Sequence, residues 1–176
     1  QKNVMYILQD FLKIANIVSD AEIFFAGPFD DIGIPYLGLE RLPNSSKTRF
    51  FEEIEKCNPE IKNRIHYLGN LNQNDLSEVY QMADLYINYS THNDEDFGMA
   101  PAEAIYSGLP ALLTNWGGFV DFHTNFPNRI TLVNVEKKKF HFGPQSNSSK
   151  ILLNKILNLK IASYSKNEND YCSINA

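Results

Sequence analysis

A doubly wound, Rossmann-like α/β fold with a mostly parallel sheet is predicted by three features of the 176-residue sequence. Short apolar runs alternate with longer segments whose apolar residues recur at helical spacing. Several of the short runs end at a glycine, which is typical of the turn after a strand. Strands that alternate with helices pair in parallel, and right-handed crossovers place helices on both faces of the sheet. Since no repeat or linker divides the chain, we expect one domain over residues 1–176.

Composition supports a globular protein and excludes several classes of function. Hydrophobic residues make up 43% of the chain and charged residues 21%, as in ordinary soluble domains. A net charge of -5 provides no basic field for nucleic acid. No apolar run reaches the roughly 20 residues of a membrane span. We therefore expect a cytoplasmic protein without a nucleic-acid partner. Since the chain lacks an initiator Met and a targeting sequence, we expect it to be a fragment.

The elements of the first half follow from periodicity and turn residues. Apolar residues at helical spacing predict a helix over Val4–Val18, and a short apolar run predicts a strand at 22–27. Glycines and prolines in 29–46 argue for an irregular insertion of undetermined role. Beyond it we expect a helix over about 47–57 capped by Ser45 or Ser46, and a strand at Ile65–Gly69. Asp75, with Glu78 three residues later, predicts the start of the next helix.

The second half continues the alternation. We expect strands at 85–89, 109–113 and 130–135, with a helix between the first two. Lys137–Lys139 is interpreted as a solvated turn. A final helix is expected over Ser148–Leu159, followed by a polar, frayed end from Ser163.

The segment between Thr91 and Gly118 has the clearest chemical signal. Gly98 permits a sharp turn, Pro101 fits the first turn of a helix, and Gly108 ends that helix. A helix N-terminus presents unpaired N–H groups and a partial positive charge, which attract phosphate. This segment therefore predicts an anion-binding turn between two strands.

Two carboxylates accompany this turn, Glu95 in the loop and Glu103 in the helix, with seven residues between them. Carboxylates accept hydrogen bonds from hydroxyl groups, so the combination describes a site for a sugar nucleotide. A first-turn glutamate also complements the helix dipole. The function is therefore predicted by the whole string rather than by Glu103 alone.

The string from Glu95 to Ala104 resembles the E-x7-E signature of family 4 retaining GT-B glycosyltransferases, and S-G-L-P follows it. The likeness extends from Lys2 to about Val135 and implies the C-terminal, donor-binding half of a GT-B fold. It implies catalytic roles for the two glutamates, with Glu95 on the sugar hydroxyls and Glu103 on the ribose hydroxyls. It places the donor phosphates on the backbone of Phe97, Gly98, Met99 and Ala100.

The same resemblance implies further donor contacts in other loops. Lys2-Asn3 resembles a phosphate-binding K-G loop with Asn in place of Gly, so Lys2 is a phosphate ligand in this interpretation. The residues implied near the base or ribose are Gly27, Gly69, Asn70 and Leu71. Gly117 and Gly118 resemble a G-G-x-x-E turn that closes on the donor, although Asp121 stands where the family has Glu. Since ligands bind at the carboxyl ends of parallel strands, we expect these loops to converge.

The implied reaction is transfer of a hexosyl group from a GDP- or UDP-linked sugar to an acceptor hydroxyl with retention, in polysaccharide, lipopolysaccharide or glycolipid synthesis. The D-E-D-F-G string slightly favours GDP-mannose. No metal and no cofactor are implied. The glycan or lipid-linked acceptor would bind an N-terminal domain absent from this chain, which could also hold the enzyme at the periphery of the inner membrane. Alone, this chain is expected to be inactive or nearly so.

Two other classes of function stay open. One is a non-catalytic nucleotide-sugar-binding or interaction module of the same fold, against which both glutamates argue. The other is a different Rossmann-type enzyme, such as an epimerase or dehydrogenase. No G-x-G-x-x-G follows an early strand, which argues against dinucleotide binding.

Overall fold

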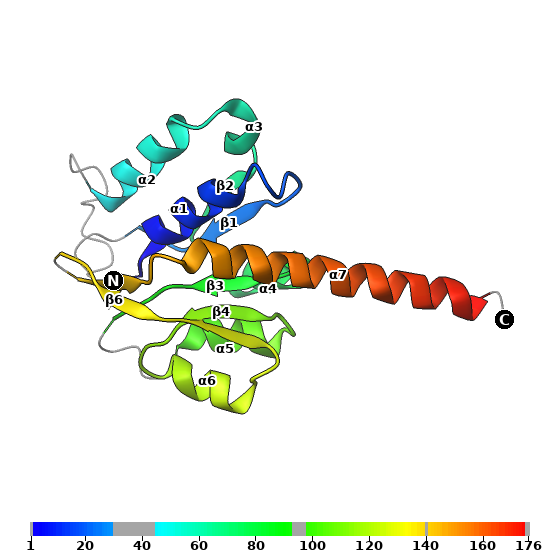
Figure 1. Cartoon of the computed structure of the whole chain (residues 1–176). Helices are drawn as coiled ribbons and strands as arrows, with labels where there is room; N and C mark the ends of the chain where they lie inside the picture. The colour runs from blue at the N-terminus through cyan, green and yellow to red at the C-terminus, as the bar shows by residue number, and fades with distance from the viewer. Residues whose placement is uncertain (1, 30–44, 93–97, 140, 175–176) are drawn as a thin grey trace. The chain divides into compact units, whose positions relative to one another are not determined.

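The computed structural model describes residues 2–29, 45–92, 98–139 and 141–174, with only the backbone described for 163–174. These residues form two compact units: unit 1 comprises residues 1–14 and 80–176, and unit 2 comprises residues 15–79. Both units contain parallel strands and helices (Figure 1). The predicted α/β class with parallel strands is therefore confirmed.

Unit 2 is built around two parallel strands. Its elements are β1 (Ile23–Ala26), α2 (Ser46–Glu55), α3 (Pro59–Lys62), β2 (Ile65–Gly69) and the first part of α4 (Gln73–Met82). Strand β1 pairs with β2 from Ile23 opposite Ile65 to Ala26 opposite Gly69. Of the two predicted caps of α2, Ser45 is the one used, since its Oγ accepts a hydrogen bond from the Thr48 amide at 3.1 Å. Helix α3 was not predicted, although Asn58-Pro59 is a standard helix start.

Two predicted helix ends in the first half of the chain were wrong. Helix α1 (Val4–Ile14) stops before Val18. The Arg64 guanidinium donates hydrogen bonds to the carbonyls of Ala15, Val18 and Ala21, so these groups are satisfied without helical partners. Helix α4 begins before Asp75, because Asn72 Oδ1 accepts from the Asp75 amide at 3.0 Å and is the capping group.

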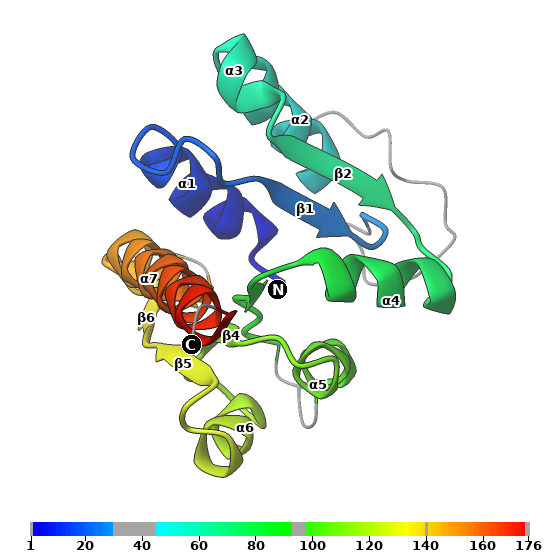
Figure 2. The same ribbon diagram turned by 90° about the vertical axis from the view of Figure 1, so that its right-hand side faces the viewer.

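Unit 1 contains a parallel three-stranded sheet in the order β3 (Tyr86–Asn88), β4 (Ala111–Thr114), β5 (Ile130–Val133). Helix α5 (Met99–Tyr106) lies on one side of this sheet and α7 (Ser148–Ile174) on the other (Figure 2). The core of the unit joins α5, β4, β5 and α6 (Phe119–Asn125) through the buried residues Ala102, Ile105, Ala111, Leu113, Phe119, Phe122 and Ile130. This core fixes the base of α5, whose N-terminus is the predicted anion site.

The C-terminal part of unit 1 differs from the prediction in two places. Strands β6 (Val135–Lys137) and β7 (Phe142–Pro144) form an antiparallel hairpin, so Lys137 ends a strand and the predicted turn is the hairpin connection. Helix α7 continues to Ile174 and extends away from the sheet (Figure 1). The frayed end predicted from Ser163 was therefore wrong. No Gly or Pro occurs in 148–174, so nothing in the sequence stops the helix.

Candidate functional site

The N-terminus of α5 has the geometry that the sequence predicts. Gly98 precedes the helix with φ 73° and ψ 77°, in the left-handed region. It is buried, and a Cβ added there would lie 2.7 Å from Cε1 of Phe119. Both the backbone conformation and the packing therefore require glycine at this position.

Two helix amides are left without an intrahelical partner at this end. The Ala102 N–H already donates to the Gly98 carbonyl at 3.0 Å, and Pro101 has no N–H. The remaining first-turn donors are those of Met99 and Ala100, and both residues are exposed. These are two of the positions predicted to hold phosphate.

Glu103 is an exposed residue of the same helix. Glu103 lies beyond the first turn, which contains no acidic residue. Because the dipole effect is confined to the first turn, it is a weaker reason for a glutamate here than the sequence alone indicates. The Tyr80 hydroxyl, from α4, donates either to the Ala100 carbonyl, at 3.3 Å, or to Glu103 Oε2, at 3.5 Å. Burial, and then the charge of Glu103, raises the pKa of Tyr80 to about 12.

Glu95 and Phe97 lie outside the described residues, but the chain leading to them is well fixed. Thr114 Oγ1 donates to the Ser90 carbonyl at 2.5 Å, and Trp116 Nε1 donates to the His92 carbonyl at 3.0 Å. Trp116 also packs against Phe142, with ring centroids 5.3 Å apart. Trp116 is therefore a packed, half-buried side chain.

Asn3 reinforces the same segment from the start of the chain. Its Nδ2 donates to the Tyr89 carbonyl at 2.8 Å and to Thr91 Oγ1 at 3.0 Å. Among the described residues it is the only non-glycine with positive φ, at 54°. Asparagine is one of the few residues that adopt this conformation readily, in agreement with Asn standing where the resembled loop has Gly. Lys2 beside it is exposed.

In unit 2 the turns after β1 and β2 lie side by side. The Gly27 N–H donates to the Gly69 carbonyl at 2.7 Å, and the Tyr67 hydroxyl donates to the Gly27 carbonyl at 3.0 Å. Both glycines have positive φ, and no atom of the described residues lies within 4 Å of a Cβ built on either. Next to them Asn70 is exposed and Leu71 half-buried. These four predicted base-side residues therefore form one turn region with open space beside its backbone.

The glycine pair after β4 opens a helix that was not predicted. Gly117 has φ 51° and is exposed, Gly118 is the residue before α6, and Asp121 lies exposed in the first turn of that helix. Helix α6 has only seven residues, which is too short for a helical repeat of apolar residues to be recognised in the sequence.

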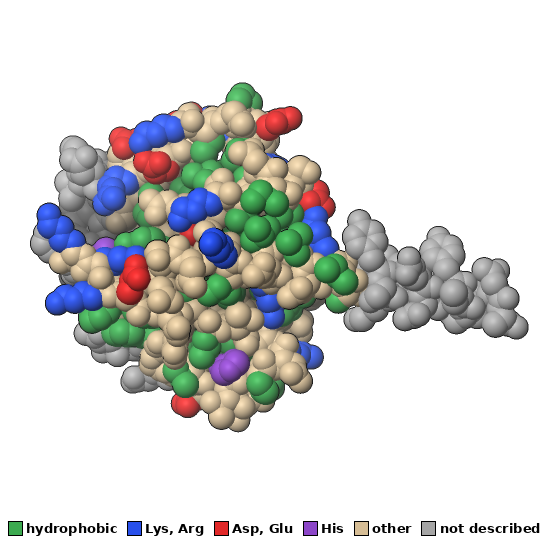
Figure 3. Space-filling view, viewed as in Figure 1, with side chains coloured by type: hydrophobic (Ala, Val, Ile, Leu, Met, Phe, Trp, Pro, Cys, Tyr) green, Lys and Arg blue, Asp and Glu red, His purple; other side chains and the backbone are tan. Residues whose placement is uncertain are grey.

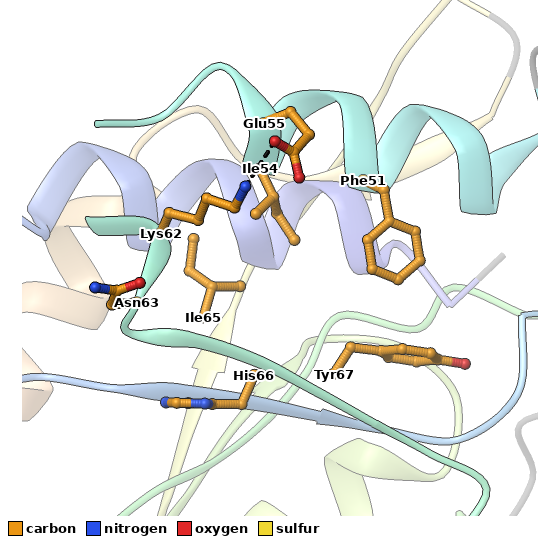
Figure 4. Close-up of a pocket in the computed structure, with 8 residues that line it drawn as sticks. All are labelled: Phe51, Ile54, Glu55, Lys62, Asn63, Ile65, His66 and Tyr67. Atoms are coloured by element: carbon orange, nitrogen blue, oxygen red, sulfur yellow. Dashed lines mark hydrogen bonds and ion pairs between the residues drawn. The ribbon is translucent and has the colours of Figure 1, made fainter. Parts of the chain in front are cut away.

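A separate pocket of about 410 Å³ lies in unit 2 between α2, α3 and β2 (Figure 4). Its lining residues are Phe51, Ile54, Glu55, Lys62, Asn63, Ile65, His66 and Tyr67. Lys62 and Glu55 form an ion pair of 2.6 Å across it. His66 stacks on Phe24 and shares a hydrogen bond with Glu22, as expected of a packed side chain rather than a catalyst. None of the predicted site residues lines this pocket.

Charged side chains are distributed without clustering by sign on the face shown in Figure 3. Within the described ranges, no cluster of three or more His, Cys, Asp or Glu residues could hold a metal ion. No helix in the part of the chain that the structure describes is long and apolar enough to cross a membrane.

Comparison with known proteins identifies the family. The model of the glycosyl transferases group 1 family matches residues 1–164. The chain belongs to this family. Membership agrees with the E-x7-E string and with the left-handed glycine at the tip of α5. No curated protein matches the chain.

Two solved structures of HepE from Anabaena are similar to the chain. The structure in complex with UDP is 20% identical with a TM-score of 0.47, and the match covers 90% of this chain and 44% of that one. The structure in complex with UDP-glucose is 22% identical with a TM-score of 0.35, and the match covers 64% of this chain and 35% of that one. This chain thus spans less than half the length of either matched protein.

Proposed function

We propose that this chain is the donor-binding part of a longer glycosyltransferase, and that it holds a nucleoside diphosphate sugar at the N-terminus of α5. The observation that carries the proposal is this turn, in a chain that belongs to the glycosyl transferases of group 1. Gly98 is left-handed, the amides of Met99 and Ala100 lack intrahelical partners, and Glu103 is exposed one turn further on.

Each part of this turn has a role in the proposal. The two amides and the helix dipole bind the diphosphate, together with Lys2. Glu103 accepts hydrogen bonds from the ribose hydroxyls, and Glu95 from the sugar hydroxyls. The family resemblance alone assigns the base to the turns at Gly27 and Gly69. Gly117 and Gly118 belong to a loop that closes on the donor.

The proposed reaction transfers a hexosyl group with retention of configuration. The bond between the anomeric carbon and the β-phosphate oxygen breaks, and its electron pair stays on the diphosphate. The acceptor hydroxyl oxygen forms the new bond, and its proton passes to the departing diphosphate. Negative charge grows on the β-phosphate, where preorganised amides stabilise it, each by about 3 kcal/mol on the scale of oxyanion holes. The acceptor, a glycan or lipid-linked hydroxyl, binds a domain outside this chain.

The test is titration calorimetry of the chain against GDP, UDP and ADP. We expect weak binding of at least one diphosphate and a loss of about tenfold in Glu103→Gln, as for a hydrogen bond to a charged group. The matched control is Glu60→Gln, an exposed glutamate near the start of α3, which should leave binding unchanged. Equal loss in both variants, or no binding of any nucleotide, would overturn the proposal.

The donor base and sugar are tested with the same protein. GDP-mannose and UDP-glucose are the two probes, the first favoured by the D-E-D-F-G string and the second bound by HepE. Incubation of the chain with either donor and a glycan acceptor should yield little or no product. Efficient transfer by the chain alone would contradict the proposal that the acceptor binds a domain outside this chain. Nucleotide binding that is unchanged in Glu103→Gln would favour a non-catalytic interaction module.

A further inference from the structure

Tyr80 is the one described residue that bonds the carboxylate of Glu103 from another element. Its ring is buried and packs edge-on against Tyr86, with centroids 6.2 Å apart. Its hydroxyl donates either to Glu103 Oε2 or to the Ala100 carbonyl, at 3.5 and 3.3 Å. A phenol has one proton, so it serves one of these acceptors at a time.

The contact matters because the Glu103 side chain is exposed, and within the described ranges Tyr80 is the residue seen to hold its carboxylate. Holding an exposed glutamate in one orientation costs up to about 2 kcal/mol of side-chain entropy, which a ligand would have to supply on binding. The hydrogen bond from the Tyr80 hydroxyl to Oε2 restricts the Glu103 side chain before a ligand binds. It also leaves Oε1 and the outer lone pairs of the carboxylate for the hydroxyls of a ligand, since an ionised carboxylate has about four acceptor sites.

The donor role of the phenol is secure over the working range of pH. Burial and the charge of Glu103 raise the pKa of Tyr80 to about 12. The hydroxyl therefore stays protonated near neutrality and does not place a second negative charge beside Glu103.

We propose that Tyr80 is a positioning residue, which holds Glu103 in the orientation that accepts the ribose hydroxyls of the nucleotide. The proposal rests on the proposed function, because it needs Glu103 to touch ribose. It adds a residue from α4 that lies outside the E-x7-E string. Its second acceptor, the Ala100 carbonyl, ties the same hydroxyl to the turn whose amides face the diphosphate.

The test is a double-mutant cycle with two ligands, UDP and its 2′-deoxy analogue, on the full chain. Tyr80→Phe keeps the ring and removes the hydroxyl, and we expect UDP binding to weaken about five- to tenfold, as for one hydrogen bond. With Glu103→Gln already present, Tyr80→Phe should add less than twofold, because coupled residues are not additive. Wild type should prefer UDP over the deoxy analogue, and Tyr80→Phe should lose most of that preference.

Tyr86→Phe is the matched control, because its hydroxyl belongs to the same aromatic pair and accepts from Asn88 Nδ2 at 3.1 Å instead. It should change neither affinity nor preference. Partial unfolding scales both affinities equally, so the ratio of the two dissociation constants stays informative even if a variant is less stable.

The outcomes separate the two proposals. If wild type binds UDP but Tyr80→Phe keeps the preference for ribose, or if its effect adds fully to that of Glu103→Gln, Tyr80 is structural only and this inference fails alone. If wild type binds neither UDP nor GDP, the proposed function fails, and the role of Tyr80 fails with it.

Discussion

Gly98 of unit 1 differs from Gly27 and Gly69 of unit 2 in what surrounds it. Gly98 in unit 1 is buried, and an added Cβ would lie 2.7 Å from the ring of Phe119. In unit 2, an added Cβ on Gly27 or Gly69 has no atom within 4 Å in the part of the chain that the structure describes. The first glycine is thus required by conformation and by packing, and the other two by conformation alone. The same residue type serves a rigid helix start in one unit and an open backbone surface in the other.

The largest expected effect is that of Gly98→Ala. The left-handed conformation costs an L-residue about 1–2 kcal/mol, and forcing a methyl group against Phe119 adds about 1–3 kcal/mol. Urea denaturation should show a loss of about 2–4 kcal/mol in the free energy of unfolding. A loss below about 1 kcal/mol would mean that Phe119 moves aside, and that packing does not distinguish the two units.

Asn3→Gly tests how much the side chain at a left-handed position contributes to the stability of unit 1. Glycine keeps the left-handed backbone but removes the donor to the Tyr89 carbonyl and Thr91 Oγ1. We expect a loss of about 1–3 kcal/mol, because the partly buried Tyr89 carbonyl and Thr91 Oγ1 lose this donor. Asn128→Gly, at an exposed turn position, should cost less than about 0.5 kcal/mol. Equal losses in the two variants would show that the Asn3 amide contributes nothing.

Gly69→Ala should cost only about 1 kcal/mol in the same assay. The strain of φ 66° amounts to about 1–2 kcal/mol, and the reduced freedom of the unfolded chain offsets part of it. Gly69→Asn should cost less than Gly69→Ala, since asparagine tolerates this conformation. A loss as large as that of Gly98→Ala would remove the contrast between open and packed glycines.

The smallest effect, absent at pH 7, concerns the buried tyrosines of unit 1. Burial, and then the charge of Asp10, raises the pKa of Tyr89, and burial raises that of Tyr80 to about 12. The folded pKa values exceed the unfolded value of about 10. The contribution of the two neutral tyrosines to the free energy of unfolding is therefore complete below pH 10 and is lost as the pH rises toward 12. Tyr89→Phe should therefore flatten the fall in stability above pH 10. An unchanged pH profile would show that Tyr89 does not contribute to alkaline unfolding.

Elements whose signal lies in neighbouring residues could be predicted from the sequence. Ser45 caps α2 and Gly98 opens α5 because capping and left-handed turns depend on local side chains. The ends of α1 and α4 were predicted wrongly for different reasons. Arg64 competes for the carbonyls after α1 from 43 to 49 residues away, which no local pattern reveals. At α4 the capping residue is Asn72, three residues before the predicted cap Asp75.

The site divides in the same way. The sequence by itself determined the turn at Gly98 that we propose binds the diphosphate, the pair of glutamates and the family, because these depend on residue types at fixed spacing along one segment. Only the tertiary structure decided that Tyr80 reaches Glu103 and that Asn3, Thr114 and Trp116 hold the chain before Glu95. Those contacts join residues 23 to 86 positions apart. The packing of helices and strands brings such residues together, and spacing along the chain does not encode it.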